Sequence, residues 1–194
     1  MPESLAPEGR RPPNDGRKVA ARNRAALIAA AREIYAESGL DVPLSAIARR
    51  AGVGQGVLYR NFPDRVALAN AVLEENVHRI EEAAANHDLA FVDLIGVLTW
   101  HLTESAAFVD LLNADLAVDR SAVRAHATNL SERVETAIRA RMPKAHQLAA
   151  GGDLMLACAM VSGAVRGATR QARRRRALAA WRLLGVEVGP VRPG

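Results

Sequence analysis

Apolar residues recur along this chain at the three- and four-residue spacing of helices, and runs of strand-forming residues are missing. The first such pattern predicts a helix from about Val19 to Ser38, which Gly39 ends. Its apolar stripe consists of Leu27, Ala30, Ala31, Ile34 and Tyr35. Together with the high content of Ala, Leu, Arg and Glu, the pattern predicts an all-α fold.

Two short predicted helices occupy residues 44–62, LSAIARRAGVGQGVLYRNF. The first has one apolar stripe, formed by Leu44, Ile47, Ala48 and Ala51. Gly52 is expected to end it with an unusual backbone conformation, and Val53 to fill the corner. The second helix places Leu58 inward and closes with Phe62, while its outward residues are Gln55, Val57, Tyr59, Arg60 and Asn61. This pattern indicates a helix-turn-helix whose second helix enters a major groove.

Longer helices are predicted downstream. One begins at Asp64, whose carboxylate we expect to cap it, and runs to about Ala85 as the link to the rest of the chain. Further helical segments are expected over 88–102, 107–116, 121–142, 154–168 and 173–184, and the tail after Gly185 is expected to fray. We divide the chain into a disordered arm rich in Pro, Gly and charge (1–17), a helix-turn-helix domain (18–63) and a larger helical domain (64–194).

Composition narrows the class of protein. The 194 residues are 49% hydrophobic and 4% aromatic, and the net charge of +5 with a pI near 10.3 favours a polyanionic partner, although solvated arginines alone would give the same figures. The single cysteine, Cys158, excludes an intrachain disulfide and is expected to be a buried, inert thiol. No signal peptide is recognisable, and the most apolar run (154–165) is too short to span a bilayer, so we expect a cytoplasmic protein.

Basic residues gather before and within the first helix. They are Arg10, Arg11, Arg17, Lys18, Arg22 and Arg24. A flexible basic arm could contact phosphates or a minor groove, and a solvated tail is an equally good interpretation. A second basic run, Arg173–Arg176, covers every face of a helix. Here a solvated helix start is favoured over a nucleic-acid patch or salt bridges to a partner.

Several motifs occur in order along the first part of the chain, namely RNRAALIAAAREIYAESG, IARRAGV and GVLYRNF, followed by Arg65 and Leu68. Over about residues 20–75 the chain therefore resembles the TetR family of bacterial transcriptional regulators. Four positions depart from the usual family pattern. Gly54 stands where many members have a capping Ser, Val57 where Thr is usual, Asn61 where His is frequent and Arg65 where Lys is frequent. The Val57 methyl groups could meet a thymine methyl.

The resemblance implies roles for single residues. Gln55 would read a base edge, Val57 would touch a base methyl, and phosphates would be bound by Ser45, Tyr59, Arg60, Asn61 and Arg65, with Gly56 also at the interface. The structural alternative is that the Tyr59 ring packs on the first helix and that Arg60 is merely solvated.

The resemblance also implies a dimer formed by the last two helices and a pocket in the larger domain. The expected dimer interface is Ala157, Val161, Ala164, Leu178 and Trp181. The expected ligand-binding residues are Phe91, Leu94, Leu98, Trp100, His101, Phe108, Leu112, His126 and Met155, with Met160 and Asn129 as further candidates. Ordinary core packing is the alternative for every apolar residue in both sets.

Catalytic motifs are not recognisable. The five histidines lack metal-ligand spacing, and the sequence has no G-x-S-x-G, P-loop or dinucleotide fingerprint. We expect no enzyme, cofactor or metal. The sequence predicts a DNA-binding transcriptional regulator, a repressor that responds to a small molecule and binds a palindromic operator as a homodimer. The alternative is a DNA-binding or architectural protein without a ligand.

Overall fold

The computed structural model describes residues 13–38, 42–114, 120–149, 153–165 and 169–193, and the side chains of these residues except 13–15, 106–114 and 120–124. The described elements are helices only. They are α1 (Pro13–Ser38), α2 (Leu44–Arg50), α3 (Gln55–Asn61), α4 (Arg65–Ala85), α5 (Phe91–Ala114), α6 (Arg120–Arg139), the 3-10 turn η1 (Gln147–Ala149), α7 (Asp153–Ala164) and α8 (Arg170–Leu183). The all-α prediction is confirmed.

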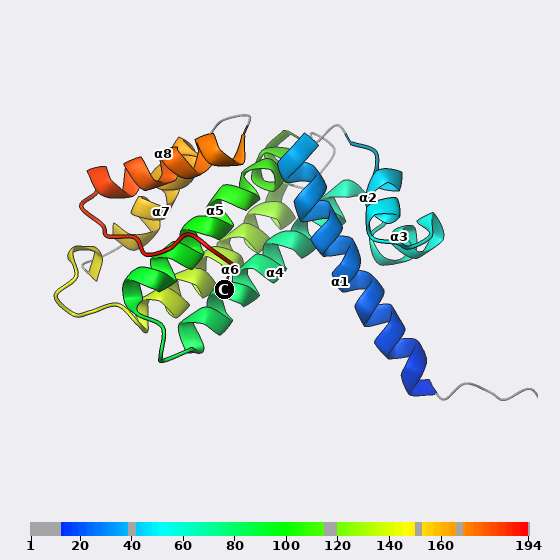
Figure 1. Ribbon diagram of the computed structural model, residues 1–194, viewed down its shortest axis with the longest axis horizontal. Helices are drawn as coiled ribbons and strands as arrows, with labels where there is room; N and C mark the ends of the chain where they lie inside the picture. Colours follow the sequence, from blue (N-terminus) through cyan, green and yellow to red (C-terminus); the bar gives the residue numbers. More distant parts are fainter. Residues whose placement is uncertain (1–12, 39–41, 115–119, 150–152, 166–168, 194) are drawn as a thin grey trace, which may run out of the picture.

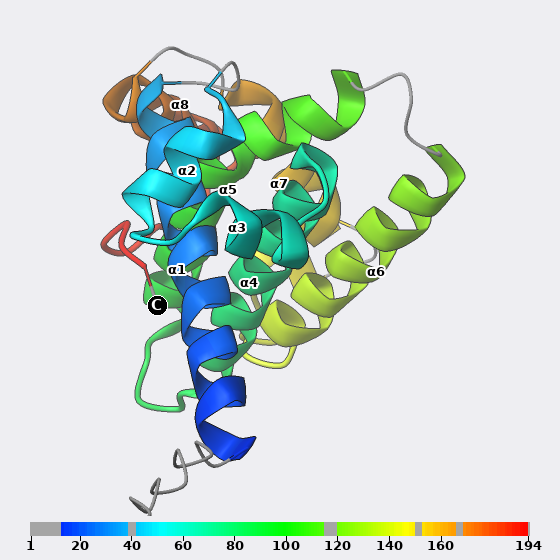
Figure 2. The same cartoon turned by 90° about the vertical axis from the view of Figure 1, so that its right-hand side faces the viewer.

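Helices α1–α3 form a small domain at one end of the molecule (Figure 1). Its core joins the apolar stripe of α1 with Ile47 and Ala48 of α2, Leu58 of α3 and the closing Phe62. Gly52 has a φ of +68°, as the sequence predicts, because the chain reverses there between α2 and α3. The last turn of α2 therefore leads directly into the first turn of α3, and α3 faces outward (Figure 2).

Helix α4 belongs to both cores. Asp64 caps it by accepting a hydrogen bond from the backbone N–H of Ala67 at 2.7 Å, which confirms the predicted cap. Its first half, with Leu68 and Val72, is buried in the small domain, whereas Val77 and Ile80 are buried in the larger one. One rigid helix thus carries the position of one domain into the other.

The larger domain packs α4–α8 around a second core. Buried apolar side chains of α5, α6 and α7 meet Trp181 of α8, whose Nε1 donates a hydrogen bond to Thr99 Oγ1 at 2.8 Å. On the outside, Arg133 of α6 forms ion pairs with Glu74 and Glu81 of α4. No helix over the described residues is long and apolar enough to cross a membrane.

Several predicted boundaries are wrong, and three of them matter most. Residues 13–17, expected in a disordered arm, belong to α1, while residues 1–12 lie outside the described part. The separate segments 88–102 and 107–116 are one helix, α5, because the residues between them contain neither Gly nor Pro to break it. Helix α7 ends at Ala164, four residues before the predicted end at Ala168.

The tail after Gly185 is packed rather than frayed. Gly185 ends α8 with a φ of +68°, and the following Val186 and Val191 are buried. The Gly189 N–H donates to Val92 O at 2.8 Å, and the tail crosses α5 so closely that a Cβ atom at Gly96 would collide with the Pro190 carbonyl oxygen. Apolar tail residues and two glycines make this close crossing possible.

Candidate functional site

The outer face of α3 is open to solvent. Gly54 is its N-cap and makes no side-chain cap hydrogen bond, so the departure from a capping Ser leaves this helix start without that bond. Gln55, Gly56, Tyr59 and Arg60 are exposed, whereas Val57 is partly buried. The Tyr59 side chain is 52% exposed, which favours an outward role over packing on α1.

Three other predicted contacts are partly buried. The Asn61 Nδ2 donates to the Val57 carbonyl oxygen at 2.8 Å, which leaves its Oδ1 for another partner. Arg65 begins α4 beside the buried Tyr35. Burial raises the pKa of the Tyr35 hydroxyl, and the Arg65 guanidinium opposes that shift. Ser45 is half-buried in the first turn of α2.

The first turns of α1 add fixed positive charge. Arg17, Lys18, Arg22 and Arg24 are all exposed on this helix, while Arg10 and Arg11 lie outside the described residues. The Arg24 guanidinium carbon lies 5.3 Å from the centroid of the Phe62 ring, at the end of α3. Arg17, which the sequence assigns to a flexible arm, is therefore held on a helix together with Lys18, Arg22 and Arg24, and Arg24 lies at the end of α3.

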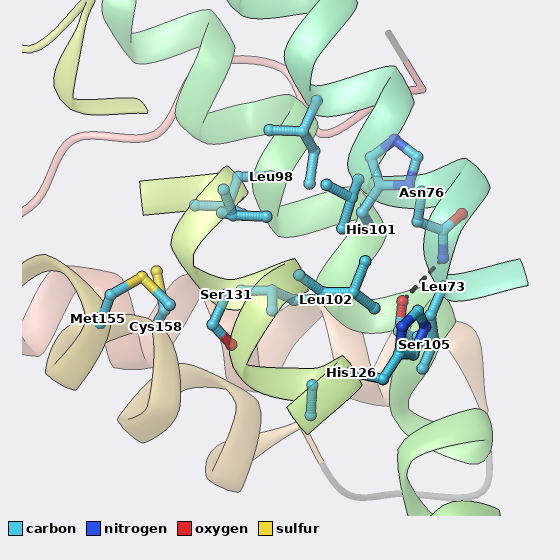
Figure 3. A pocket seen from close by; sticks show the side chains of 15 residues that line it. Leu73, Asn76, Leu98, His101, Leu102, Ser105, His126, Ser131, Met155 and Cys158 are labelled. Carbon is cyan, nitrogen blue, oxygen red and sulfur yellow. Dashed lines mark hydrogen bonds between the residues drawn. The ribbon is translucent and has the colours of Figure 1, made fainter. Parts of the chain in front are cut away.

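A cavity of about 250 Å³ lies in the larger domain between α4, α5, α6 and α7 (Figure 3). Its lining is mostly apolar. The lining residues are Leu73, Asn76, Val77, Ile80, Leu98, His101, Leu102, Ser105, His126, Ala127, Leu130, Ser131, Val134, Met155 and Cys158. Such a volume with a few convergent polar groups is typical of a small-molecule site.

Four of the predicted ligand-binding residues line this cavity, namely Leu98, His101, His126 and Met155. Others do not. Leu94 is buried in the core. The Phe91 ring packs edge-on against the His146 ring, with their centroids 5.1 Å apart. Trp100 contacts His101 and Arg32. Met160 is exposed on α7, Asn129 is exposed on α6, and the side chains of Phe108 and Leu112 lie outside the described residues.

Sequence reasoning missed the contribution of α4. Leu73, Asn76, Val77 and Ile80 all border the cavity, although the sequence places them in an ordinary core stripe. Asn76 is the signal that could have found the site. It is a polar residue in an otherwise apolar stripe, and polar residues at core positions mark either a hydrogen-bond network or a ligand.

Three of the five predicted dimer residues are not on the surface of the single chain. Ala157, Val161 and Trp181 are buried in the domain's own core, and Ala164 and Leu178 are half-buried. The exposed apolar stripe lies on the opposite face of α7. It consists of Leu156, Ala159, Met160 and Gly163, at helical spacing, with Leu183 exposed on neighbouring α8.

The arginines at the start of α8, namely Arg170 and the run Arg173–Arg176, have different surroundings. Arg170 forms an ion pair with the buried Glu104, with Nη2 2.9 Å from Oε2 and Nε 2.8 Å from Oε1. The Arg173 Nε donates to the Thr103 carbonyl oxygen at 3.1 Å, while Arg174 and Arg175 are exposed. One side of the run thus fastens α8 to α5.

Two features bear on the chemistry of the cavity and its surroundings. Burial raises the pKa of Cys158 to about 12, with Glu135 adding to the shift, so the thiol is an unreactive wall of the cavity. Over the described residues, no group of three or more His, Cys, Asp or Glu side chains is placed to hold a metal ion.

Comparison with known proteins gives a consistent result. Residues 27–72 match the family model of bacterial regulatory proteins of the tetR family. A TetR transcriptional regulator from Streptomyces coelicolor is 27% identical, with 85% of this chain and 98% of that chain covered and a TM-score of 0.51. GusR of Salmonella enterica is 20% identical, with 85% and 95% covered and a TM-score of 0.51, and supports the fold alone.

No curated protein sequence gives a significant match. The family model covers α1–α4 at the residues that form the small core, and the Streptomyces regulator extends the likeness over the larger domain. Residues 27–72 therefore match the tetR family of bacterial regulatory proteins, and the chain as a whole resembles a solved TetR transcriptional regulator.

Proposed function

We propose that this regulator is a repressor that binds a palindromic operator as a homodimer and releases it when a small molecule occupies the cavity. The observation that carries the proposal is the position of α4. The helix is buried in the small domain at Leu68 and Val72 and borders the cavity at Leu73, Val77 and Ile80. Because the protein acts on DNA, we place its site of action in the cytoplasm.

The DNA contacts are assigned from exposure and position on α2, α3 and the start of α4. Gln55 and Val57 at the start of α3 meet base edges in the major groove. Tyr59 and Arg60 bind phosphates, together with Ser45, Asn61 and Arg65 at the edges of the surface and the Gly56 backbone between them. The exposed cations on the first turns of α1 extend this surface.

The dimer is assigned to the exposed stripe on α7 together with Leu183 of α8. Leu156 and Met160 are 61% and 53% exposed, and Leu183 is 85% exposed. Ala159 and Gly163 between them are small enough for a second helix to approach closely. A two-fold axis at this face places two α3 helices on successive major grooves, about 34–36 Å apart.

The ligand response requires two arrangements of the domains that bind the ligand unequally. A ligand between α4 and α6 pushes against Leu73, Val77 and Ile80, and the rigid helix transmits that displacement to Asp64 and the start of the DNA-reading domain. The spacing or tilt of the two α3 helices then no longer fits the operator. Reciprocally, operator DNA weakens ligand binding by the same factor.

The test begins with selection of bound DNA from a random pool, followed by fluorescence anisotropy and analytical ultracentrifugation. We expect a palindromic site bound by two chains, and Met160→Glu to give monomers with weaker operator binding. The matched control is Arg174→Glu on the exposed face of α8. A non-palindromic site bound by one chain would refute the dimer. Unchanged operator affinity across a broad panel of small molecules that bind the protein would refute the ligand response.

A further inference from the structure

The cavity has two chemically different ends (Figure 3). Met155 and Cys158 lie at one end, and Asn76, His101, Ser105 and His126 gather at the other. Between them lie Leu98 and Leu102, while Leu73 lies at the polar end and the exposed Ser131 of α6 lies on the side of Met155 and Cys158. An occupant must therefore have an apolar body and its polar group at one end.

The polar end contains buried groups whose hydrogen-bonding capacity is unused. His101 and Asn76 are each 3% exposed. Within the part of the chain that the structure describes, neither ring nitrogen of His101 has a hydrogen-bond partner, nor has Asn76 Oδ1 or His126 Nε2. The Asn76 Nδ2 donates to Ser105 Oγ at 2.9 Å, which fixes the amide with its oxygen free. Buried polar groups in native proteins are nearly always paired, so these atoms point to a missing partner.

The partner is uncharged. The lining of the cavity over the described residues contains no Lys, Arg, Asp or Glu that could neutralise a charged ligand. His101 supplies no charge either, because burial and the nearby Arg32 and Arg79 lower its pKa to about 3. An ammonium group would lose its hydration here and face the positive charges of Arg32 and Arg79, and a carboxylate would find no cationic side chain among the described lining residues.

The unused groups also define which uncharged group fits. Neutral His101 offers one N–H donor and one nitrogen acceptor, and Asn76 Oδ1 offers an acceptor. A hydroxyl group donates and accepts at once, so it can donate to Asn76 Oδ1 while it accepts from the protonated ring nitrogen of neutral His101. A ketone or an ester accepts only and leaves Asn76 Oδ1 unpaired. A water molecule satisfies the same atoms but leaves the aliphatic remainder of the cavity unfilled.

We propose that the cavity binds an uncharged alcohol or phenol with an apolar body, its hydroxyl group held between His101 and Asn76. The size follows from volume. Since an apolar cavity of about 150 Å³ holds benzene, the 250 Å³ here corresponds to roughly ten non-hydrogen atoms. The proposal rests on the proposed ligand response, because it names the chemical class of that ligand.

The test measures binding to the full chain by isothermal titration calorimetry. The probes are 4-propylphenol and 1-octanol as uncharged hydroxyl compounds, propylbenzene without the hydroxyl, and 4-propylbenzoate with a charge. We expect at least one hydroxyl probe to bind and 4-propylphenol to bind at least tenfold more tightly than propylbenzene, with 4-propylbenzoate the weakest. Equal affinity for 4-propylphenol and propylbenzene, tightest binding of 4-propylbenzoate, or binding of neither hydroxyl probe overturns the proposal.

Variants locate the hydroxyl group. Asn76→Leu keeps the side-chain volume and should reduce the preference for 4-propylphenol over propylbenzene to about twofold or less. Gln171→Leu, which replaces an exposed amide on α8 outside the cavity, is the matched control and should keep the tenfold preference. An unchanged preference in folded Asn76→Leu, as judged by thermal melting, contradicts the assigned contact. If Asn76→Leu fails to fold, the wild-type comparison of the four probes still decides the ligand class.

A parallel anisotropy titration on operator DNA separates the two proposals. Release of DNA by 4-propylphenol supports both. Binding of 4-propylphenol without release supports the ligand class and refutes the ligand response. Release of DNA by 4-propylbenzoate but not by the hydroxyl probes refutes the ligand class and supports the response.

Discussion

The guanidinium carbon of Arg32 on α1 lies 5.8 Å from the centroid of the Trp100 ring on α5. The Trp100 ring in turn meets the His101 ring edge-on, with centroids 4.8 Å apart and planes at 87°. His101 borders the cavity, so these three side chains form a contact chain from the cavity to α1. This gives the DNA-reading domain a second connection to the larger domain beside α4.

Arg32→Met should weaken the coupling between cavity and DNA. The change removes the cation above the Trp100 ring but keeps a long apolar side chain at a half-buried position. We expect the variant to bind the operator with nearly normal affinity when no ligand is present. The factor by which ligand lowers operator affinity should be smaller than in the wild type. Fluorescence anisotropy at both ligand conditions measures this factor. Arg174→Met is the control, and equal factors in Arg32→Met and the wild type would exclude this route.

Two substitutions on α3 should have different effects on DNA binding. Arg60→Ala removes a phosphate contact, so affinity should fall for all sequences and the slope of log K against log salt should decrease by about 1. Gln55→Ala should instead relax the preference at one base pair of the site, by about 1–3 kcal/mol. Binding-site selection and salt titrations distinguish them. An unchanged selected motif with Gln55→Ala would remove that residue from base recognition.

The basic start of α1 should add to affinity but not to sequence preference. Arg17 precedes Arg24 by seven residues and so lies on the same face, about 10 Å further along the helix. Since Arg24 lies against Phe62 at the end of α3, Arg17 extends from the same side of the domain. Arg17→Ala should lower affinity several-fold on every sequence and reduce the salt slope. Arg182→Ala, exposed on α8, should change neither quantity.

Stability should fall below neutral pH through His101. Its pKa is about 3 in the folded chain and about 6.5 when unfolded, so below pH 6.5 the unfolded state binds a proton that the folded state does not. The stability contributed by the neutral ring is present above pH 6.5 and is lost as the pH falls towards 3. Between pH 7 and pH 5 the wild type should lose about 2 kcal/mol more than His101→Gln.

Urea denaturation at both pH values measures this difference. His87→Gln at an exposed position is the control and should behave as the wild type. Equal losses of stability in the wild type and in His101→Gln would show that His101 is protonated in the folded chain.

Gly96→Ala should destabilise the larger domain. The new Cβ atom meets the backbone carbonyl of Pro190, which is not a flexible side chain and must move together with the tail. We expect a loss of about 1–3 kcal/mol in the free energy of unfolding. Gly56→Ala on α3 meets no atom within 4 Å and should stabilise slightly. Thermal melting of both variants without DNA provides the comparison.

The sequence predicts the small domain well because its signals are local. Gly52 needs a left-handed backbone, Asp64 caps the helix that follows, and the stripe of α1 has one buried face, and each of these features follows from a few neighbouring residues. The structure agrees with all three. Backbone sterics and helix periodicity decide these features, and neither depends on distant parts of the chain.

The cavity and the exposed stripe of α7 depend on how helices pack, and here sequence reasoning is weaker. Helix α7 has small or apolar residues on every side, so periodicity does not tell which side faces Trp181. Val161 faces the core and Met160 faces solvent, although they are neighbours in sequence and both apolar. Trp100 and His101 differ in the same way, since one reaches towards α1 and the other borders the cavity.

The crossing of the tail over α5 should be visible in evolution. Gly96 and Gly189 lie far apart in sequence, yet the tail approaches α5 only because neither carries a side chain. Homologues that keep this crossing should retain glycine at both positions together, whereas those with a displaced or shortened tail should accept larger residues at position 96. The pair would then co-vary as a marker of how this regulator subgroup closes its larger domain.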